Sequence, residues 1–151
     1  MNWKSSGSAI ENARSVLAKM LAKYLKNGRK AADGQRSPEE LHDFRIETKR
    51  FRYTAELFHR IYGAALEREL EPVKELQSVL GKLHDFHVIA ERLKRDKALQ
   101  GGLERLTKKK LKEFHQQWEA FDSKGRLEQW ERLLTGRPAK SGAVRSKRKT
   151  R

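Results

Sequence analysis

The stretch that decides the fold occupies residues 37–62 and reads SPEELHDFRIETKRFRYTAELFHRIY. It opens with the signals of a helix start: Ser37 at the N-cap, a proline at the first helical position, and Glu40 three residues after the serine. Apolar residues then recur at the three- and four-residue spacing of one helix face. These residues are Phe44, Phe51, Ala55, Phe58 and Tyr62. We therefore predict a helix that runs to about Tyr62 and is ended by Gly63.

The segments on either side of this stretch also have helical periodicity. The expected helices cover about residues 9–27, 64–97 and 103–134. The pair Asn27-Gly28 is expected to end the first of them, and Gly101-Gly102 to separate the last two. Pro72 is expected to kink the third helix or to split off a short lead-in, and residues 122–125 to interrupt the fourth. No alternating pattern typical of a strand occurs between these segments.

Four amphipathic helices with short connections predict an all-α fold, an antiparallel four-helix bundle. The expected domain spans residues 9–134. Residues 135–151 contain seven Lys or Arg and no acidic residue, and they are low in apolar content. We expect this basic C-terminal tail to be disordered.

The composition limits the classes of partner. The 151 residues carry a formal net charge of +15, which is common where the partner is a polyanion such as nucleic acid, an anionic membrane or an inorganic phosphate chain. The chain has no cysteine, which excludes disulfides and thiolate metal sites and fits a reducing cytoplasm. No apolar run approaches the roughly 18 residues of a transmembrane helix, so we expect no membrane insertion.

A second stripe lies beside the apolar face of the helix at 38–62. Its members follow one another at helical spacing: His42, Arg45, Lys49, Arg52, Tyr53 and Glu56. Three cations and a histidine stacked along one side of a helix repel one another. That arrangement is favoured if an anion sits among them. The alternative is a set of surface side chains that lay their stems along the core boundary, with Glu56 and nearby acids as partners.

The helix at 64–97 shows a matching polar face. Its members are Lys74, Gln77, Gly81, Asp85, Val88 and Arg92, with His84 and Arg95 at the edge. A glycine in a helix interior is less favourable than alanine by roughly 1 kcal/mol. Gly81 therefore indicates the close approach of another helix or a ligand, although a tolerated interior glycine explains it as well.

The two stripes contain motifs that resemble the CHAD domain, the conserved-histidine α-helical family. In the block 41–58 the family has a histidine, an arginine three residues on, a basic pair at +7 and +8, an arginine at +10 and often a tyrosine at +11. The residues at those positions here are His42, Arg45, Lys49, Arg50, Arg52 and Tyr53. The block 73–88 is similar to the family in its Leu76-Gln77, Leu80-Gly81 and Asp85.

The resemblance implies an all-helical fold that binds inorganic polyphosphate through Lys, Arg and His side chains lining a basic groove or pore. The expected polyphosphate-binding residues are His42, Arg45, Lys49, Arg50, Arg52, Tyr53, Lys74, Gln77, Lys82, His84 and Arg92. The family's usual unit is about twice this length and has two similar halves, of which this chain resembles the second. Either a one-sided groove or a homodimer that restores both halves would follow, and we favour the homodimer.

Two other functions compete with this one. The first is a nucleic-acid-binding protein, supported by the net charge and by the basic tail as a non-specific contact. The second is a metal-dependent phosphohydrolase, suggested by His42 and by His84-Asp85 with His87, although His84 and His87 point about 60° apart on a helix. No nucleophile–base pair or phosphate-cradling glycine loop occurs, and His59 and His115 have no evident partners. We predict a non-catalytic cytoplasmic protein with no cofactor or metal, associated with polyphosphate granules.

Overall fold

The structure is a computed structural model, which describes residues 9–136. Within this range all regular structure is helical, which confirms the predicted all-α class. The helices are α1 (Ala9–Ala31), α2 (Pro38–Glu56), α3 (His59–Arg92), α4 (Lys97–Phe121) and α5 (Arg126–Leu134). The predicted tail lies mostly outside the described residues.

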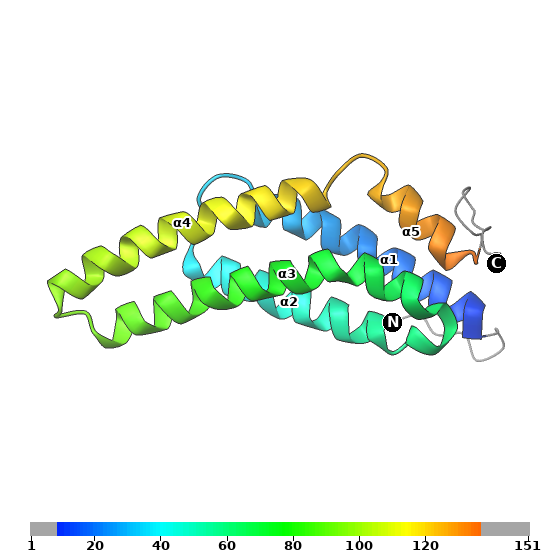
Figure 1. Cartoon of the computed structure of the whole chain (residues 1–151), viewed down its shortest axis with the longest axis horizontal. Helices are drawn as coiled ribbons and strands as arrows, with labels where there is room; N and C mark the ends of the chain where they lie inside the picture. Colours follow the sequence, from blue (N-terminus) through cyan, green and yellow to red (C-terminus); the bar gives the residue numbers. More distant parts are fainter. Residues whose placement is uncertain (1–8, 137–151) are drawn as a thin grey trace, which may run out of the picture.

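Successive helices run back and forth, and α5 continues in the direction of α4 (Figure 1). The five helices thus form four antiparallel rods, the last of them divided at residues 122–125 as predicted. α3 packs against both α2 and α4, while α1 packs against α2 and α5. The joined end of α3 and α4 projects beyond the start of α2 (Figure 1). That end of the bundle therefore has fewer helices around it.

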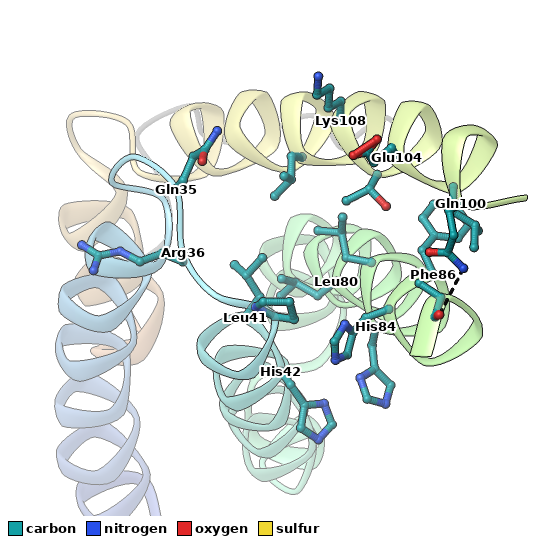
Figure 2. A pocket seen from close by; sticks show the side chains of 17 residues that line it. Gln35, Arg36, Leu41, His42, Leu80, His84, Phe86, Gln100, Glu104 and Lys108 are labelled. Atoms are coloured by element: carbon teal, nitrogen blue, oxygen red, sulfur yellow. Dashed lines mark hydrogen bonds between the residues drawn. The ribbon is translucent and has the colours of Figure 1, made fainter. Parts of the chain in front are cut away.

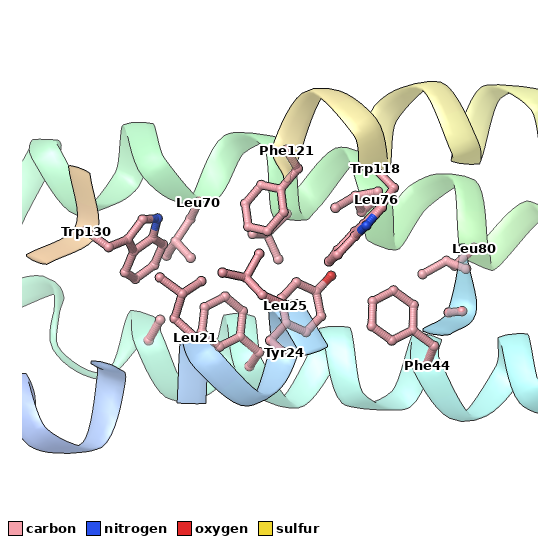
Figure 3. Close-up of a cluster of buried hydrophobic side chains, with 14 of the residues drawn as sticks. Leu21, Tyr24, Leu25, Phe44, Leu70, Leu76, Leu80, Trp118, Phe121 and Trp130 are labelled. Carbon is pink, nitrogen blue, oxygen red and sulfur yellow. The ribbon is translucent and has the colours of Figure 1, made fainter. Parts of the chain in front are cut away.

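An aromatic cluster fills the core between the rods (Figure 3). The ring of Tyr24 stacks on Phe44 and Phe51 at centroid distances of 5.1 and 4.8 Å. The edges of Trp118 and Phe121 meet the same ring at 5.7 and 5.9 Å. The tyrosine hydroxyl bonds to Thr48 Oγ1 at 2.8 Å, so its polar end is satisfied inside the core. The core thereby fixes which side of α2 faces inward.

The prediction that Asn27-Gly28 ends the first helix was wrong. α1 continues through Gly28 to Ala31, and Gly28 is buried. A Cβ at this position would overlap the indole of Trp118 on α4. The glycine therefore permits a close contact between α1 and α4, and its conformation is helical rather than left-handed. The sequence alone did not distinguish a glycine required for helix packing from one that ends a helix.

The predicted end of the second helix at Tyr62 was also wrong. α2 ends at Glu56, and a turn at residues 57–58 separates it from α3. Gly63 takes φ 61° and ψ −141° and kinks α3 near its start. Pro72 stands inside α3 without a comparable break in dihedral angles. The predicted bend of this helix therefore lies at the glycine, whose missing Cβ permits a positive φ.

The prediction that Gly101-Gly102 separates two helices was wrong, because both glycines lie inside α4. The reversal occurs at residues 93–96, after α3 ends at Arg92 rather than near residue 97. Asp96 caps α4 by accepting a hydrogen bond from the backbone N–H of Leu99 at 3.0 Å. This cap and the burial of Leu103, directly after the glycines, stabilise the helix through them.

Candidate functional site

The polar stripes of α2 and α3 meet along the line where these two antiparallel helices pack. His42 stacks on His84, with ring centroids 4.1 Å apart and planes 20° from parallel. Further along, Arg52 Nη1 donates to Gln77 Oε1 at 3.0 Å. We call this line the α2–α3 seam and define it as His42, Arg45, Lys49 and Arg52 of α2 with Lys74, Gln77, Gly81 and His84 of α3.

The core side of α2 determines where its seam residues point. Leu41, Phe44, Thr48, Phe51 and Ala55 are buried, and each seam residue follows one of them by one position. Because one residue turns a helix by about 100°, the seam residues lie at the boundary of the core. All four of those on α2 are half-buried. Their charged groups are therefore held against the protein surface.

Gly81 lies beside the guanidinium group of Arg45. A Cβ built on Gly81 would lie 3.7 Å from Arg45 Nε, which is an ordinary van der Waals contact. Arg45 Nε is itself buried, and it has no hydrogen-bond partner within residues 9–136. A buried guanidinium N–H without a partner is unfavourable by about 1–3 kcal/mol or more. Arg45 thus retains a donor that a bound anion can satisfy.

The two stacked imidazoles share an unusual electrostatic environment. The Nδ1 atoms of His42 and His84 are both buried, and neither has a hydrogen-bond partner among the described residues. Burial is the main cause of a lowered pKa for His84, and the nearby His42 and Arg45 lower it further. Asp85 opposes this change, while His87 adds to it. An anion beside the pair would reverse the effect, since it favours the protonated ring.

Arg52 is the most constrained cation of the seam. Besides its bond to Gln77, its Nε lies 3.3 Å from Glu56 Oε2, four residues further along α2. Its guanidinium carbon lies 4.7 Å from the centroid of the Tyr53 ring, within cation–π distance. Glu56 therefore orients a basic side chain, as the sequence suggested.

The two lysines of the seam differ in whether they form an ion pair. Lys74 Nζ lies 3.3 Å from Glu71 Oε2 on its own helix. Across the part of the chain that the structure describes, Lys49 forms neither an ion pair nor a side-chain hydrogen bond, and the same holds for Arg45. The centre of the seam is therefore occupied by two cations that no carboxylate neutralises directly.

Four predicted site residues are not part of the seam as defined. Tyr53 is exposed next to Arg52, whose guanidinium lies over its ring. Arg50 is exposed and borders a hollow with Met20 and Lys23, on the side of α2 that faces α1. Lys82 is exposed one position past Gly81, and Arg92 is exposed at the last position of α3, on the end that projects beyond α2.

Two further residues lie near the histidine end of the seam. His87 is half-buried, and its Nε2 lies 3.7 Å from Glu39 Oε2. Lys108 borders a cavity together with His42 and His84. At the opposite end of α3, His59, expected to have no evident partner, contacts Glu67 at 2.8 Å. The pairs His87–Glu39 and His59–Glu67 connect separate turns or helices, which periodicity alone does not reveal.

The described residues offer no group of three or more His, Asp or Glu side chains suited to a metal ion. In the same range, no helix combines the length and apolar character needed to cross a bilayer. The chemistry available at the seam is therefore that of fixed cations, imidazoles and neutral donors.

The fold and the seam define an all-α protein with a cationic face between two antiparallel helices. The CHAD domain family matches residues 2–94, more than half of the chain, and the chain therefore belongs to that family. The match spans α1, α2, α3 and every residue of the seam. The family is associated in general with polyphosphate binding. No curated protein and no solved structure matches the chain significantly.

Proposed function

We propose that this protein binds inorganic polyphosphate along the α2–α3 seam and does not hydrolyse it. One observation carries the proposal: Arg45 and Lys49 are half-buried one turn apart on α2, between two imidazoles and Arg52, and no carboxylate of residues 9–136 pairs with either. Like charges held this close repel one another. A phosphate chain laid along the seam would remove that repulsion and fill the unused donors.

The seam residues would contribute different interactions. Arg45 can donate two parallel hydrogen bonds to phosphate oxygens, and Lys49 and Lys74 act as mobile point charges. Arg52 is already oriented by Gln77 and Glu56, so it presents its remaining N–H groups at little entropic loss. His42 and His84 can each donate a ring N–H to phosphate oxygens, and a bound phosphate would raise the pKa of His84, which burial lowers.

Counterion release makes salt the first test. Each neutralised phosphate should release condensed counterions, so the logarithm of affinity should fall linearly with the logarithm of salt concentration. Titration of long polyphosphate between about 50 and 300 mM salt should show a steep slope. Affinity should also rise from tripolyphosphate to long chains. An affinity that salt does not change would contradict the electrostatic mechanism.

Nucleic acid is the competitor that this experiment must separate. RNA and duplex DNA, added at the same phosphate concentration, should displace labelled polyphosphate only weakly from residues 9–136. Full displacement by either would favour the nucleic-acid alternative. Orthophosphate release from polyphosphate in the presence of Mg²⁺ or Mn²⁺ should not exceed the protein-free rate. Release that disappears in His84→Ala would favour the phosphohydrolase instead.

A homodimer remains part of the proposal. A second copy facing the seam would enclose the phosphate chain between two sets of cations. Light scattering with and without polyphosphate should then show a mass of two chains in the bound state. A monomer at all concentrations and in both states would leave a one-sided binding face.

A further inference from the structure

A cavity of about 330 Å³ lies at the projecting end of the bundle, between the start of α2, the second half of α3 and the first half of α4 (Figure 2). It is bordered by the loop before α2, which contains Gln35 and Arg36. The volume falls at the lower end of the range of about 300–1,000 Å³ that is typical of small-ligand sites. Of the residues that line this cavity, only His42 and His84 also belong to the seam.

The accessible lining of the cavity is mainly apolar, and its aliphatic residues are Leu41, Leu80, Leu83, Leu103, Leu111 and Ala90. Two polar side chains at its border are held by backbone carbonyls. Gln100 Nε2 donates to the carbonyl oxygens of Ala90 and Leu93, at 3.2 and 2.7 Å. Arg36 Nε donates to the carbonyl of Lys30 at 2.8 Å.

Basic and imidazole groups gather at one side of this apolar space. The rings of His42 and His84 lie there together (Figure 2). His87, three residues further along α3, also borders the cavity. Arg45 is close enough to His84 to influence its protonation. The opposing acids are Glu104 on α4, Asp85 beside His84, and Glu39, which contacts His87. The histidine side therefore favours an anionic group.

We infer that this cavity binds a single-chain anionic amphiphile, a fatty carboxylate or an alkyl phosphate, with its hydrocarbon chain among the leucines and its head group at His84 and His87. A nucleobase fits less well, because its polar edges would be buried against the leucines. The inference does not depend on polyphosphate binding.

Isothermal titration of the full chain with hexanoate, octanoate and decanoate, each below its micelle concentration, tests the apolar part. Affinity should rise about three- to fourfold for each methylene that enters the cavity. Decyl phosphate should bind in the same range as decanoate, whereas decanol should bind at least about fivefold more weakly because it lacks the charge. Equal binding of decanol and decanoate would overturn the assignment of the head group.

Two pairs of variants locate the site. Ala90→Phe fills the cavity and should weaken decanoate binding about tenfold or more, while Ala98→Phe, at an exposed position outside the lining, should change it less than twofold. Ala90→Leu is the milder alternative if the phenylalanine variant does not fold. His87→Gln should weaken decanoate but not decanol, and His59→Gln at the opposite end of α3 should affect neither.

Two results would overturn the inference as a whole. One is the absence of decanoate binding at millimolar concentration to the intact protein. The other is binding that Ala90→Phe and Ala98→Phe reduce equally, which would indicate general surface adsorption. Because these titrations contain no polyphosphate, their failure leaves the proposed function of the seam untouched. Failure of polyphosphate binding likewise leaves the cavity result intact.

Discussion

The two sides of α2 both carry polar groups, but they differ in whether these groups have hydrogen-bond partners within the protein. Toward α1, Tyr24 bonds to Thr48 at 2.8 Å, and Asn27 Nδ2 donates to both carboxylate oxygens of Glu47 at 3.0 and 2.8 Å. Toward α3, Arg45 Nε and the Nδ1 atoms of the stacked histidines have no partner in the described part of the chain.

The difference separates groups that stabilise the fold from groups to which we assign a role in binding. Buried polar groups in native proteins are nearly always hydrogen-bonded, so unpaired polar atoms gathered on one face require an explanation. The side facing α1 satisfies these groups internally, and its substitution should change stability. If the proposed function holds, an anion satisfies the groups on the side facing α3, and their substitution should change binding.

The largest expected effect comes from reversing charge on the side facing α3. Arg45→Glu with Lys49→Glu should lower polyphosphate affinity about 100-fold or more, because two charge-assisted contacts become repulsive. The melting temperature should stay the same or rise, since repulsion within the seam is relieved. The matched control is Lys109→Glu with Lys112→Glu on the exposed face of α4, which should change affinity less than about fivefold. Equal losses in both double variants would show that only net charge matters.

The next effect belongs to the side facing α1. Thr48→Val leaves the buried Tyr24 hydroxyl without its partner and should reduce the free energy of unfolding by about 1–3 kcal/mol. Adding Tyr24→Phe should recover much of that loss. Urea unfolding measures both variants. Polyphosphate affinity of the folded Thr48→Val protein should remain within twofold, and a large drop would mean that the two sides are not independent.

The third effect is a pH dependence at His84. Its pKa is lowered in the folded protein, so the unfolded chain binds more protons near its value of about 6.5. This group's contribution to stability is therefore lost as the pH falls from about 7 through that value. A bound polyanion favours the protonated ring, so affinity should rise about three- to tenfold between pH 7.5 and 5.5. In His84→Gln both slopes should flatten, whereas His115→Gln should retain them.

The smallest effect tests the one carboxylate that pairs with a cation of α2 on the seam. Glu56→Gln removes the negative partner of Arg52. Because a half-exposed ion pair contributes little, the change should raise polyphosphate affinity only about twofold and shift stability by less than about 1 kcal/mol. A titration at low salt is the sensitive measurement. A loss of affinity would mean that Glu56 acts mainly by holding Arg52 in position.

Much of the seam could be predicted from periodicity. The spacing of Arg45, Lys49 and Arg52 placed them on one stripe next to the apolar face, and the structure has them there. The contact between His42 and His84 could not be predicted, because it depends on the register between two helices. Arg50 was included through its place in a motif, although 100° of helical rotation turns it toward α1.

The sequence by itself determined the helical class, the start of α2 at its Ser-Pro-Glu-Glu signal, and the core stripe of that helix. These features depend on interactions within a few residues along the chain. Only the tertiary structure decided that Gly28 lies under Trp118 inside α1, that α3 and α4 reverse at Asp96, and that a cavity opens beside the histidines. Each of these follows from contacts between helices, and the energy of packing outweighs the weak local preferences of glycine.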